Sequence, residues 1–262
     1  IIKVIPLIMG LLIIPVSMRM IKIDIPFEVQ LHWKGVSTEY DIFGYYRSIL
    51  LIINAVITSV ILFFSFTSDT FIRVKKLKPV FIAFGILVLF SILSTFFGGN
   101  TVISFGGAPT RYEGLYSFIG YYFLFLYAVT LDYDDKTQHI IIIALAIFTV
   151  ACSIVGFFQY IGKDLFLTPT GAMYYIPDSL KQFRDSMSTT QFSFSTMYIF
   201  NSHYNYSSFL MGILSSFWIV YTIVSAERFY KILSAVMTVL SILMLLGTNG
   251  RSGIVALFIT VV

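Results

Sequence analysis

Long apolar runs, separated by polar stretches of varied length, dominate the pattern of this chain. With a window of roughly 19 residues, about eight runs are candidate transmembrane helices. They cover residues 1–18, 48–66, 80–97, 115–131, 140–161, 206–224, 232–247 and 254–262. The last run is only about nine residues long, too short to cross a bilayer, so we interpret it as a truncated span. The pattern therefore predicts an all-α polytopic bundle of transmembrane helices.

The composition of the chain favours the same class. Hydrophobic residues make up 58% of it and charged residues only 11%, and its mean hydropathy is +0.89. The surface of a soluble domain of this size would need about 25% charged residues. We therefore expect an integral membrane protein, with residues 1–262 forming a single transmembrane domain. Both ends lie inside apolar runs, which favours a fragment of a longer protein.

The orientation of the spans follows from the short loops, since short loops rich in Lys and Arg stay in the cytoplasm. Two short connections carry such residues: Arg73, Lys75, Lys76 and Lys78 in one, Arg228 and Lys231 in the other. We expect these loops and the N-terminus to be cytoplasmic, in a bacterial cytoplasmic membrane. Four connections then lie outside: residues 19–47, 98–114, 162–205 and 248–253.

The net charge of +4 comes mostly from the two cytoplasmic clusters. Such clusters suit anionic lipid headgroups, so membrane lipids are the expected partners. Nucleic acid is not expected as a partner, because the chain has no basic and aromatic platform on a soluble domain. The number of subunits is left open.

Two outer connections carry a pattern of their own. Apolar and polar residues alternate over residues 22–34, up to Trp33 and Lys34, which predicts an extended segment that lies on the membrane surface or pairs with another strand. After Pro177, apolar residues fall on one helical face as far as Met187, which predicts an amphipathic helix in the interface.

Several kinds of chemistry find no support in the sequence. His32, His139 and His203 lie in separate loops with no carboxylate at ligand spacing, so no metal site is predicted. Phosphate-binding glycine loops and Ser-His-Asp patterns are missing as well, and no cofactor is expected. Cys152 lies inside an apolar span and is interpreted as a small core residue.

Polar residues at the outer ends of the spans are the remaining candidates. Arg251 lies in a six-residue polar stretch between two apolar runs, where a permanent cation needs water or an anionic partner. Arg251 is either an interfacial anchor or a ligand contact, and the flanking glycine and serine would let a backbone or ligand approach it closely. Arg111 and Glu113 precede another span. Arg111 either contacts a ligand, pairs with Glu113 or reaches the lipid headgroups.

A third group precedes the span at 206–224. Asn201 and Asn205 are four residues apart and would share a face on a helix, where they contact substrate, cap the helix or bond to another helix. His203 is either a ligand contact or an ordinary loop histidine. Aromatic residues of the same loop either stack on sugar rings or belong to the aromatic belt of the membrane interface. They are Tyr174, Tyr175, Phe192, Phe194, Tyr198 and Phe200.

Four short motifs, taken in their order, resemble the O-antigen ligase and O-antigen polymerase family. They are Tyr-Asp-Ile-Phe-Gly-Tyr-Tyr-Arg at 40–47, Arg-Tyr-Glu-Gly-Leu at 111–115, Asn-x-x-x-Asn-Tyr at 201–206 and Thr-Asn-Gly-Arg-Ser-Gly at 248–253. Each motif is short, and only the order of all of them carries the resemblance, which covers most of the chain.

The resemblance implies a metal-independent, inverting membrane glycosyltransferase. Its members take a glycan from a polyprenyl-pyrophosphate carrier at the outer face and transfer it to a growing polymer, to lipid A core or to protein. Arg251 would contact the pyrophosphate, with Arg111, Asn201, Asn205 and His203 as further substrate-binding candidates. The family's proposed catalytic histidine lies beyond residue 262, and His203 does not replace it.

Physical chemistry adds one catalytic candidate to this picture. A general base must deprotonate the acceptor hydroxyl, and Glu113 is the carboxylate next to a motif arginine. A different class of function is also compatible with an arginine at the outer mouth of a span. The chain would then be a transporter for a small anion or an exported glycan.

Overall fold

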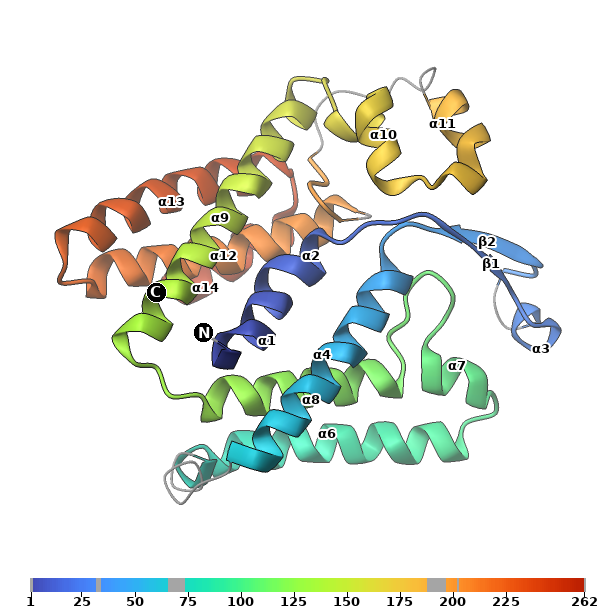
Figure 1. The fold of residues 1–262 in the computed structure, drawn as a ribbon, viewed down its shortest axis with the longest axis horizontal. Helices are drawn as coiled ribbons and strands as arrows, with labels where there is room; N and C mark the ends of the chain where they lie inside the picture. Colours follow the sequence, from blue (N-terminus) through green and yellow to red (C-terminus); the bar gives the residue numbers. More distant parts are fainter. Residues whose placement is uncertain (1, 32–33, 66–73, 188–196, 202, 262) are drawn as a thin grey trace. The chain divides into compact units, whose positions relative to one another are not determined.

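The computed structural model describes residues 2–31, 34–65, 74–187, 197–201 and 203–261. They form helices joined by turns, together with one two-stranded hairpin (Figure 1). The all-α prediction is thus confirmed apart from that hairpin. Several residues singled out in the sequence lie outside the described ones: His32, Trp33, Arg73, Phe192 and Phe194.

Within the described residues, five helices are long and apolar enough to cross a membrane, which indicates a multi-pass membrane protein. They are α4 (Gly44–Ser65), α6 (Lys78–Phe97), α9 (Asp135–Tyr160), α12 (Tyr204–Val224) and α13 (Arg228–Gly247). The other three predicted spans form shorter apolar helices, among them α8 (Leu115–Thr130) and α14 (Arg251–Val261).

The first predicted span contains one short apolar helix, Ile5–Val16, whose middle part is π-helical. It consists of η1 (Ile2–Val4), α1 (Ile5–Ile8), a π-helical segment η2 (Met9–Ile13) and α2 (Ile14–Val16). Pro6 and Pro15 each lie in the first turn of one α-helical piece. Proline lacks the backbone N–H that a regular α-helix would use, which favours a local departure from α-helical hydrogen bonding while the helix continues.

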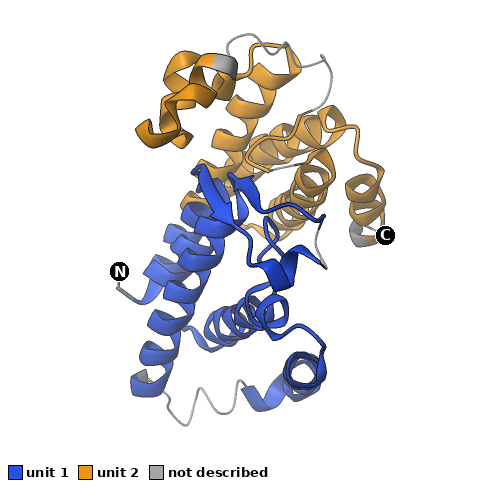
Figure 2. Cartoon of the chain, turned by 90° about the vertical axis from the view of Figure 1, so that its right-hand side faces the viewer, with its two compact units in different colours: residues 1–141 blue, residues 142–262 orange. Residues whose placement is uncertain are grey.

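The chain groups into two compact units, residues 1–141 and 142–262 (Figure 2). The interpretation of the chain as a single transmembrane domain stays a prediction.

In the first unit, α8 packs against both α4 and α6. Gly120 permits the close approach to α4, because a Cβ there would lie 2.9 Å from Cγ of Leu51. Leu7, Leu62 and Tyr127 are buried together in the core of this unit.

The hairpin of the first unit joins β1 (Ile21–Asp24) and β2 (Thr38–Asp41) as antiparallel strands. The predicted extension of residues 22–34 holds only for the start of that range. From Pro26 the backbone turns into α3 (Phe27–Gln30), because the Val29 and Gln30 N–H groups donate to the Pro26 carbonyl at 2.9 and 3.0 Å. The partner strand of β1 is β2, residues 38–41.

In the second unit, α12 packs against α13 and α14. The fully buried Trp218 donates its indole N–H to Oγ1 of Thr149 on α9 at 2.9 Å, so a polar pair holds α9 and α12 together. This bond satisfies the indole inside an apolar core. The outer connection of this unit contains η3 (Leu165–Leu167), α10 (Pro169–Tyr175), η4 (Asp178–Leu180) and α11 (Lys181–Met187).

The segment after Pro177 is helical, as predicted. Its polar face is partly engaged, because Arg184 forms an ion pair with Asp178. The hydrogen bond from Arg184 lowers the pKa of the Asp178 carboxyl below its usual range. The location of this helical segment in the membrane interface stays a prediction.

Candidate functional site

Arg251 is the first residue of α14, directly after a tight turn that ends α13. Thr248 is fully buried in this turn, and Asn249 adopts a positive φ of 54°. Asparagine tolerates this left-handed conformation better than most residues. The turn therefore fixes where α14 begins, and it places the Arg251 side chain on the exposed surface.

The start of α14 is held against α12 by one serine. Ser208 Oγ donates to the Gly250 carbonyl at 2.7 Å and accepts from the Gly253 N–H at 3.1 Å. A Cβ at Gly253 would overlap the Ser208 backbone carbonyl, and one at Gly250 would overlap the Ser208 side chain. Glycine is therefore required at both positions, where the two helices approach closely.

The N-termini of α12 and α14 consequently lie at the same end of the second unit, since Ser208 lies in the second turn of α12. Each helix N-terminus carries about half a positive charge. The Arg251 and Ser252 N–H groups, and the Arg251 guanidinium, have no hydrogen-bond or ion-pair partner within the described residues. This end of the unit therefore combines two helix N-termini with the exposed Arg251 and two unused donors at the start of α14.

The predicted cluster before the span at 206–224 is arranged around the cap of α12. His203 is the N-cap, and its Nδ1 accepts the Asn205 N–H at 3.2 Å. The helix begins only at Tyr204, so the prediction that Asn201 and Asn205 share a helical face is wrong. Asn201 lies in the preceding turn and donates to Ser207 Oγ at 3.1 Å, whereas Asn205 is exposed.

A second set of hydrogen bonds ties this turn to the end of α9. Gln159 Oε1 accepts the N–H groups of Tyr198 and Ile199 at 3.1 and 2.7 Å. The Tyr198 hydroxyl donates to Asp164. Burial raises the pKa of Tyr198, and the hydrogen bond to Asp164 raises that pKa further. Burial also raises the pKa of Tyr175 to about 12, again with a contribution from Asp164.

The first unit brings two of the predicted outer connections together. Gly44, at the start of α4, lies against the Thr110 carbonyl, which a Cβ at Gly44 would approach to 2.7 Å. The ring centroids of Tyr45 and Tyr112 are 5.6 Å apart, in an edge-to-face arrangement. Burial raises the pKa of Tyr112, and the Asp41 carboxylate raises it further. The N-termini of α4 and α8 thus share one end of this unit.

Arg111 and Glu113 lie in the turn that leads into α8, and both are exposed. Thr110 and Tyr112, the residues before and after Arg111, have positive φ values of 69° and 54°. Such left-handed residues are costly outside glycine, so the turn is strained.

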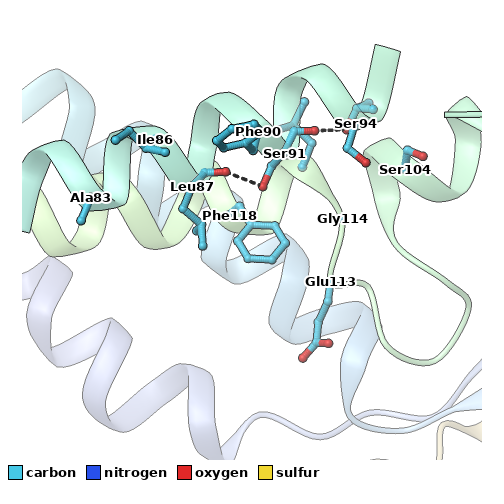
Figure 3. A pocket seen from close by; sticks show the side chains of 12 residues that line it. Ala83, Ile86, Leu87, Phe90, Ser91, Ser94, Ser104, Glu113, Gly114 and Phe118 are labelled. Carbon is cyan, nitrogen blue, oxygen red and sulfur yellow. Dashed lines mark hydrogen bonds between the residues drawn. The ribbon is translucent and has the colours of Figure 1, made fainter. Parts of the chain in front are cut away.

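Glu113 lines a cavity of about 610 Å³ between α6, α7 (Thr101–Gly106) and the start of α8. Figure 3 shows the apolar side chains of this cavity at one end and its serines at the other. Glu113 extends from the loop at the edge of the cavity, with its carboxylate directed away from α6. This cavity was not predicted from the sequence. The hydroxyl residues in the last turns of α6 were the available signal.

The predicted site residues therefore fall into two groups. Arg111 and Glu113 belong to the first unit, and Asn201, His203, Asn205 and Arg251 belong to the second. Within the described residues, no group of three or more His, Cys, Asp and Glu side chains is placed to hold a metal ion.

Comparisons of the chain with protein-family models, with curated proteins and with solved structures find no match.

Proposed function

We propose that this chain takes part in the transfer of a glycan from a polyprenyl-pyrophosphate carrier to a glycan or lipid acceptor. The reaction would take place at the outer face of a bacterial cytoplasmic membrane. One observation carries the proposal: Arg251, a cation without a partner in the described structure, lies at the positive end of two helices that Ser208 holds together. A cation is unfavourable there by about 0.3–1 kcal/mol unless an anion binds beside it.

A pyrophosphate group suits this arrangement chemically. In the proposed inverting reaction, an acceptor hydroxyl attacks the anomeric carbon, the bond from that carbon to the pyrophosphate oxygen breaks, and a base takes the hydroxyl proton. Negative charge then develops on the leaving pyrophosphate. The Arg251 guanidinium binds two phosphate oxygens at once, and the Arg251 and Ser252 N–H groups are further donors. These groups supply charge stabilisation without a metal.

The first unit supplies the candidates for the acceptor side. Glu113 is an exposed carboxylate beside a cavity and is our candidate for positioning or deprotonating the acceptor hydroxyl. Arg111, two residues earlier, is a second candidate for contact with the pyrophosphate-linked substrate. In the second unit, Asn205 and His203 flank the N-terminus of α12 and would contact the same substrate, while Asn201 acts through its bond to Ser207.

The proposal includes a topology with about eight spans and a cytoplasmic N-terminus. The five long helices support the membrane part of it. The structure also brings the predicted outer connections to shared helix ends, 19–47 with 98–114 in the first unit and 162–205 with 248–253 in the second. Within each unit, the pairing supports the placement of its two connections on one side of the membrane.

Substitution of Arg251 in the full-length protein tests the proposal. Arg251→Ala is expected to reduce glycan transfer at least tenfold, and Arg251→Lys to restore little of it, because lysine lacks the bidentate fork. Arg228→Ala is the matched control, since Arg228 is also the exposed first residue of an apolar helix but belongs to a predicted cytoplasmic loop. Wild-type transfer in both Arg251 variants would remove Arg251 from the mechanism.

A transporter for a small anion or an exported glycan is the second candidate function. The π-helical segment of the first run favours it, because π segments inside helices are frequent at functional sites. The segment is contacted by Asn54, whose amide donates to the Pro6 carbonyl at 3.0 Å while its buried Oδ1 has no partner. Liposomes containing the purified protein separate the two functions: transfer without solute flux supports the enzyme, and flux without transfer supports the transporter.

A further inference from the structure

A fully buried asparagine of α4 has an unused side-chain oxygen where this helix meets the first apolar helix. Asn54 is 0% exposed. Its Nδ2 donates to the Pro6 carbonyl at 3.0 Å, whereas its Oδ1 has no hydrogen-bond partner within the described residues. The Pro6 carbonyl can only accept, so it fixes which of the two side-chain atoms faces it. Oδ1 therefore requires a partner that donates a hydrogen bond or carries positive charge.

A second acceptor without a helical donor lies beside Asn54, in the π-helical segment η2. The Ile14 N–H donates to the Met9 carbonyl, one residue further back than in an α-helix. In the same pattern the Gly10 carbonyl would accept from residue 15, but that residue is Pro15, which has no N–H. Gly10 adjoins the asparagine, because a Cβ at Gly10 would lie 3.8 Å from Asn54 Nδ2. Proline and the π register together thus leave a backbone oxygen next to an unused side-chain oxygen.

Thr58, one turn after Asn54 on the same face of α4, adds a third oxygen. It is fully buried, and its hydroxyl shares its single hydrogen between the Asn54 and Ala55 carbonyls, at 2.9 and 2.8 Å. The lone pairs of Thr58 Oγ1 therefore remain as acceptors. Three oxygens that can only accept are the surroundings that a cation requires.

The charge and the space around these oxygens decide which cation fits. No charged residue occurs in the apolar stretches that meet here, residues 5–16, 48–65 and 115–130. Divalent ions favour carboxylate ligands, whereas carbonyl oxygens alone can replace the hydration shell of a monovalent ion. Space is short, since a Cβ at Gly10 would already lie 3.0 Å from Leu124 Cδ2. The site therefore suits a small bare monovalent ion and excludes an organic ammonium group.

We propose that Asn54 Oδ1, the Gly10 carbonyl and Thr58 Oγ1 bind a sodium ion between α4 and the first apolar helix. Backbone carbonyls that are freed where membrane helices depart from regular winding are known ligands of sodium. The bound ion holds residues 9–13 in the π register and fixes this helix against α4. Neither Arg251 nor Glu113 takes part, so sodium binding goes beyond the proposed glycan transfer and is tested independently of it.

The first test is the sodium dependence of the wild type. Thermal unfolding of the full-length protein in detergent is compared in sodium chloride and in choline chloride at equal ionic strength, since choline is too large for the site. Sodium at about ten times its Kd is expected to raise the Tm by about 3–6 °C. Radioactive sodium should bind saturably, at one ion per chain. Equal Tm values in the two salts, without saturable sodium binding, would overturn the proposal and favour a buried water beside Asn54.

A proline variant tests the backbone ligand. Pro15→Ala supplies the missing N–H, so the Gly10 carbonyl receives a donor in either register, from Ile14 in an α-helix or from residue 15 in a π-helix. Sodium affinity should fall about tenfold, the ratio expected when one neutral ligand is withdrawn. Pro79→Ala is the matched control, since Pro79 lies in the first turn of α6, where an N–H has no helical acceptor. Sodium affinity of wild-type strength in Pro15→Ala would refute the site.

An asparagine variant tests the side-chain ligand. Asn54→Leu removes Oδ1 and should abolish saturable sodium binding, whereas Ile53→Leu, at the exposed neighbouring position of α4, should leave it unchanged. Sodium binding that persisted in Asn54→Leu would place the ion elsewhere. If Asn54→Leu does not fold without its bond to Pro6, Pro15→Ala decides, because that variant removes no hydrogen bond.

Discussion

The contact between Gly253 and Ser208 offers the sharpest test of how the candidate anion site is built. In Gly253→Ala, the new methyl group would overlap the Ser208 carbonyl oxygen. That oxygen belongs to the backbone of α12, so no side-chain rotation relieves the overlap. The start of α14 must therefore move away from α12, and Arg251, two residues before Gly253, must move with it.

The expected loss of stability follows from two effects. Overpacking of this kind costs about 1–3 kcal/mol. A displaced Gly253 also loses its N–H bond to Ser208 Oγ, and a buried donor without a partner costs about 1–3 kcal/mol. We therefore expect Gly253→Ala to lower the free energy of unfolding by about 2–5 kcal/mol. Ser208→Ala should cost about 1–3 kcal/mol, because it removes the bonds without adding bulk.

Thermal unfolding in detergent, with and without inorganic pyrophosphate, measures both the loss of stability and the loss of pyrophosphate binding. Pyrophosphate bound at the proposed site would stabilise the wild type by about 2.7 kcal/mol at a concentration 100 times its Kd. Both variants should lose part of this stabilisation, because the donors at the start of α14 are no longer held in place. Gly85→Ala in α6 is the control, since a Cβ there meets nothing within 4 Å. If Gly253→Ala unfolded and bound pyrophosphate like Gly85→Ala, the reasoning would be refuted.

Two further predictions concern the outer loop and the topology. Asp164→Asn keeps an acceptor for the nearby backbone but removes the charge, so the pKa values of Tyr198 and Tyr175 should both fall in an alkaline absorbance titration. Folding raises these pKa values, so the two protonated tyrosines contribute their full stability below pH about 10. In the wild type, the contribution of Tyr175 is lost as the pH rises towards about 12. Unchanged tyrosine titration in the variant would contradict the role of Asp164. In a cysteine-free background, a cysteine at Ser104 should react with an impermeant thiol reagent from outside and one at Lys76 should not; the reverse result would invert the topology.

The helices were largely predictable from the sequence because apolar runs in a membrane must satisfy their backbone groups internally. All eight predicted runs contain helix, from the segment at residues 2–16 to α14. Their lengths were less predictable. The first run contains Pro6 and Pro15, and the hydropathy window counts proline by polarity alone rather than by its missing N–H. This is why a full-length span was expected where the helix covers only Ile5–Val16 and contains a π-helical segment.

The candidate site was predictable only in part. Arg251 stood out because an isolated charge between apolar runs is costly wherever it lies. Ser208 and Gln159 did not stand out, since a serine or glutamine in an apolar run is common and their partners lie about 40 residues away in sequence. Their importance depends on which helix ends meet, which only the packed structure shows. The cavity beside Glu113 was missed for the same reason, because its walls come from separate helices.

The parallel course of α12 and α14 follows from the lengths of the two connecting turns alone, and it supports the proposed role of Arg251. The turns that join α12 to α13 and α13 to α14 are only three residues each, so α13 must run back along α12 and α14 must run parallel to α12. Two parallel helices bring two positive ends to the same side. Arg251 adds a third positive charge at that point, so an anion bound there in the proposed function would interact favourably with all three.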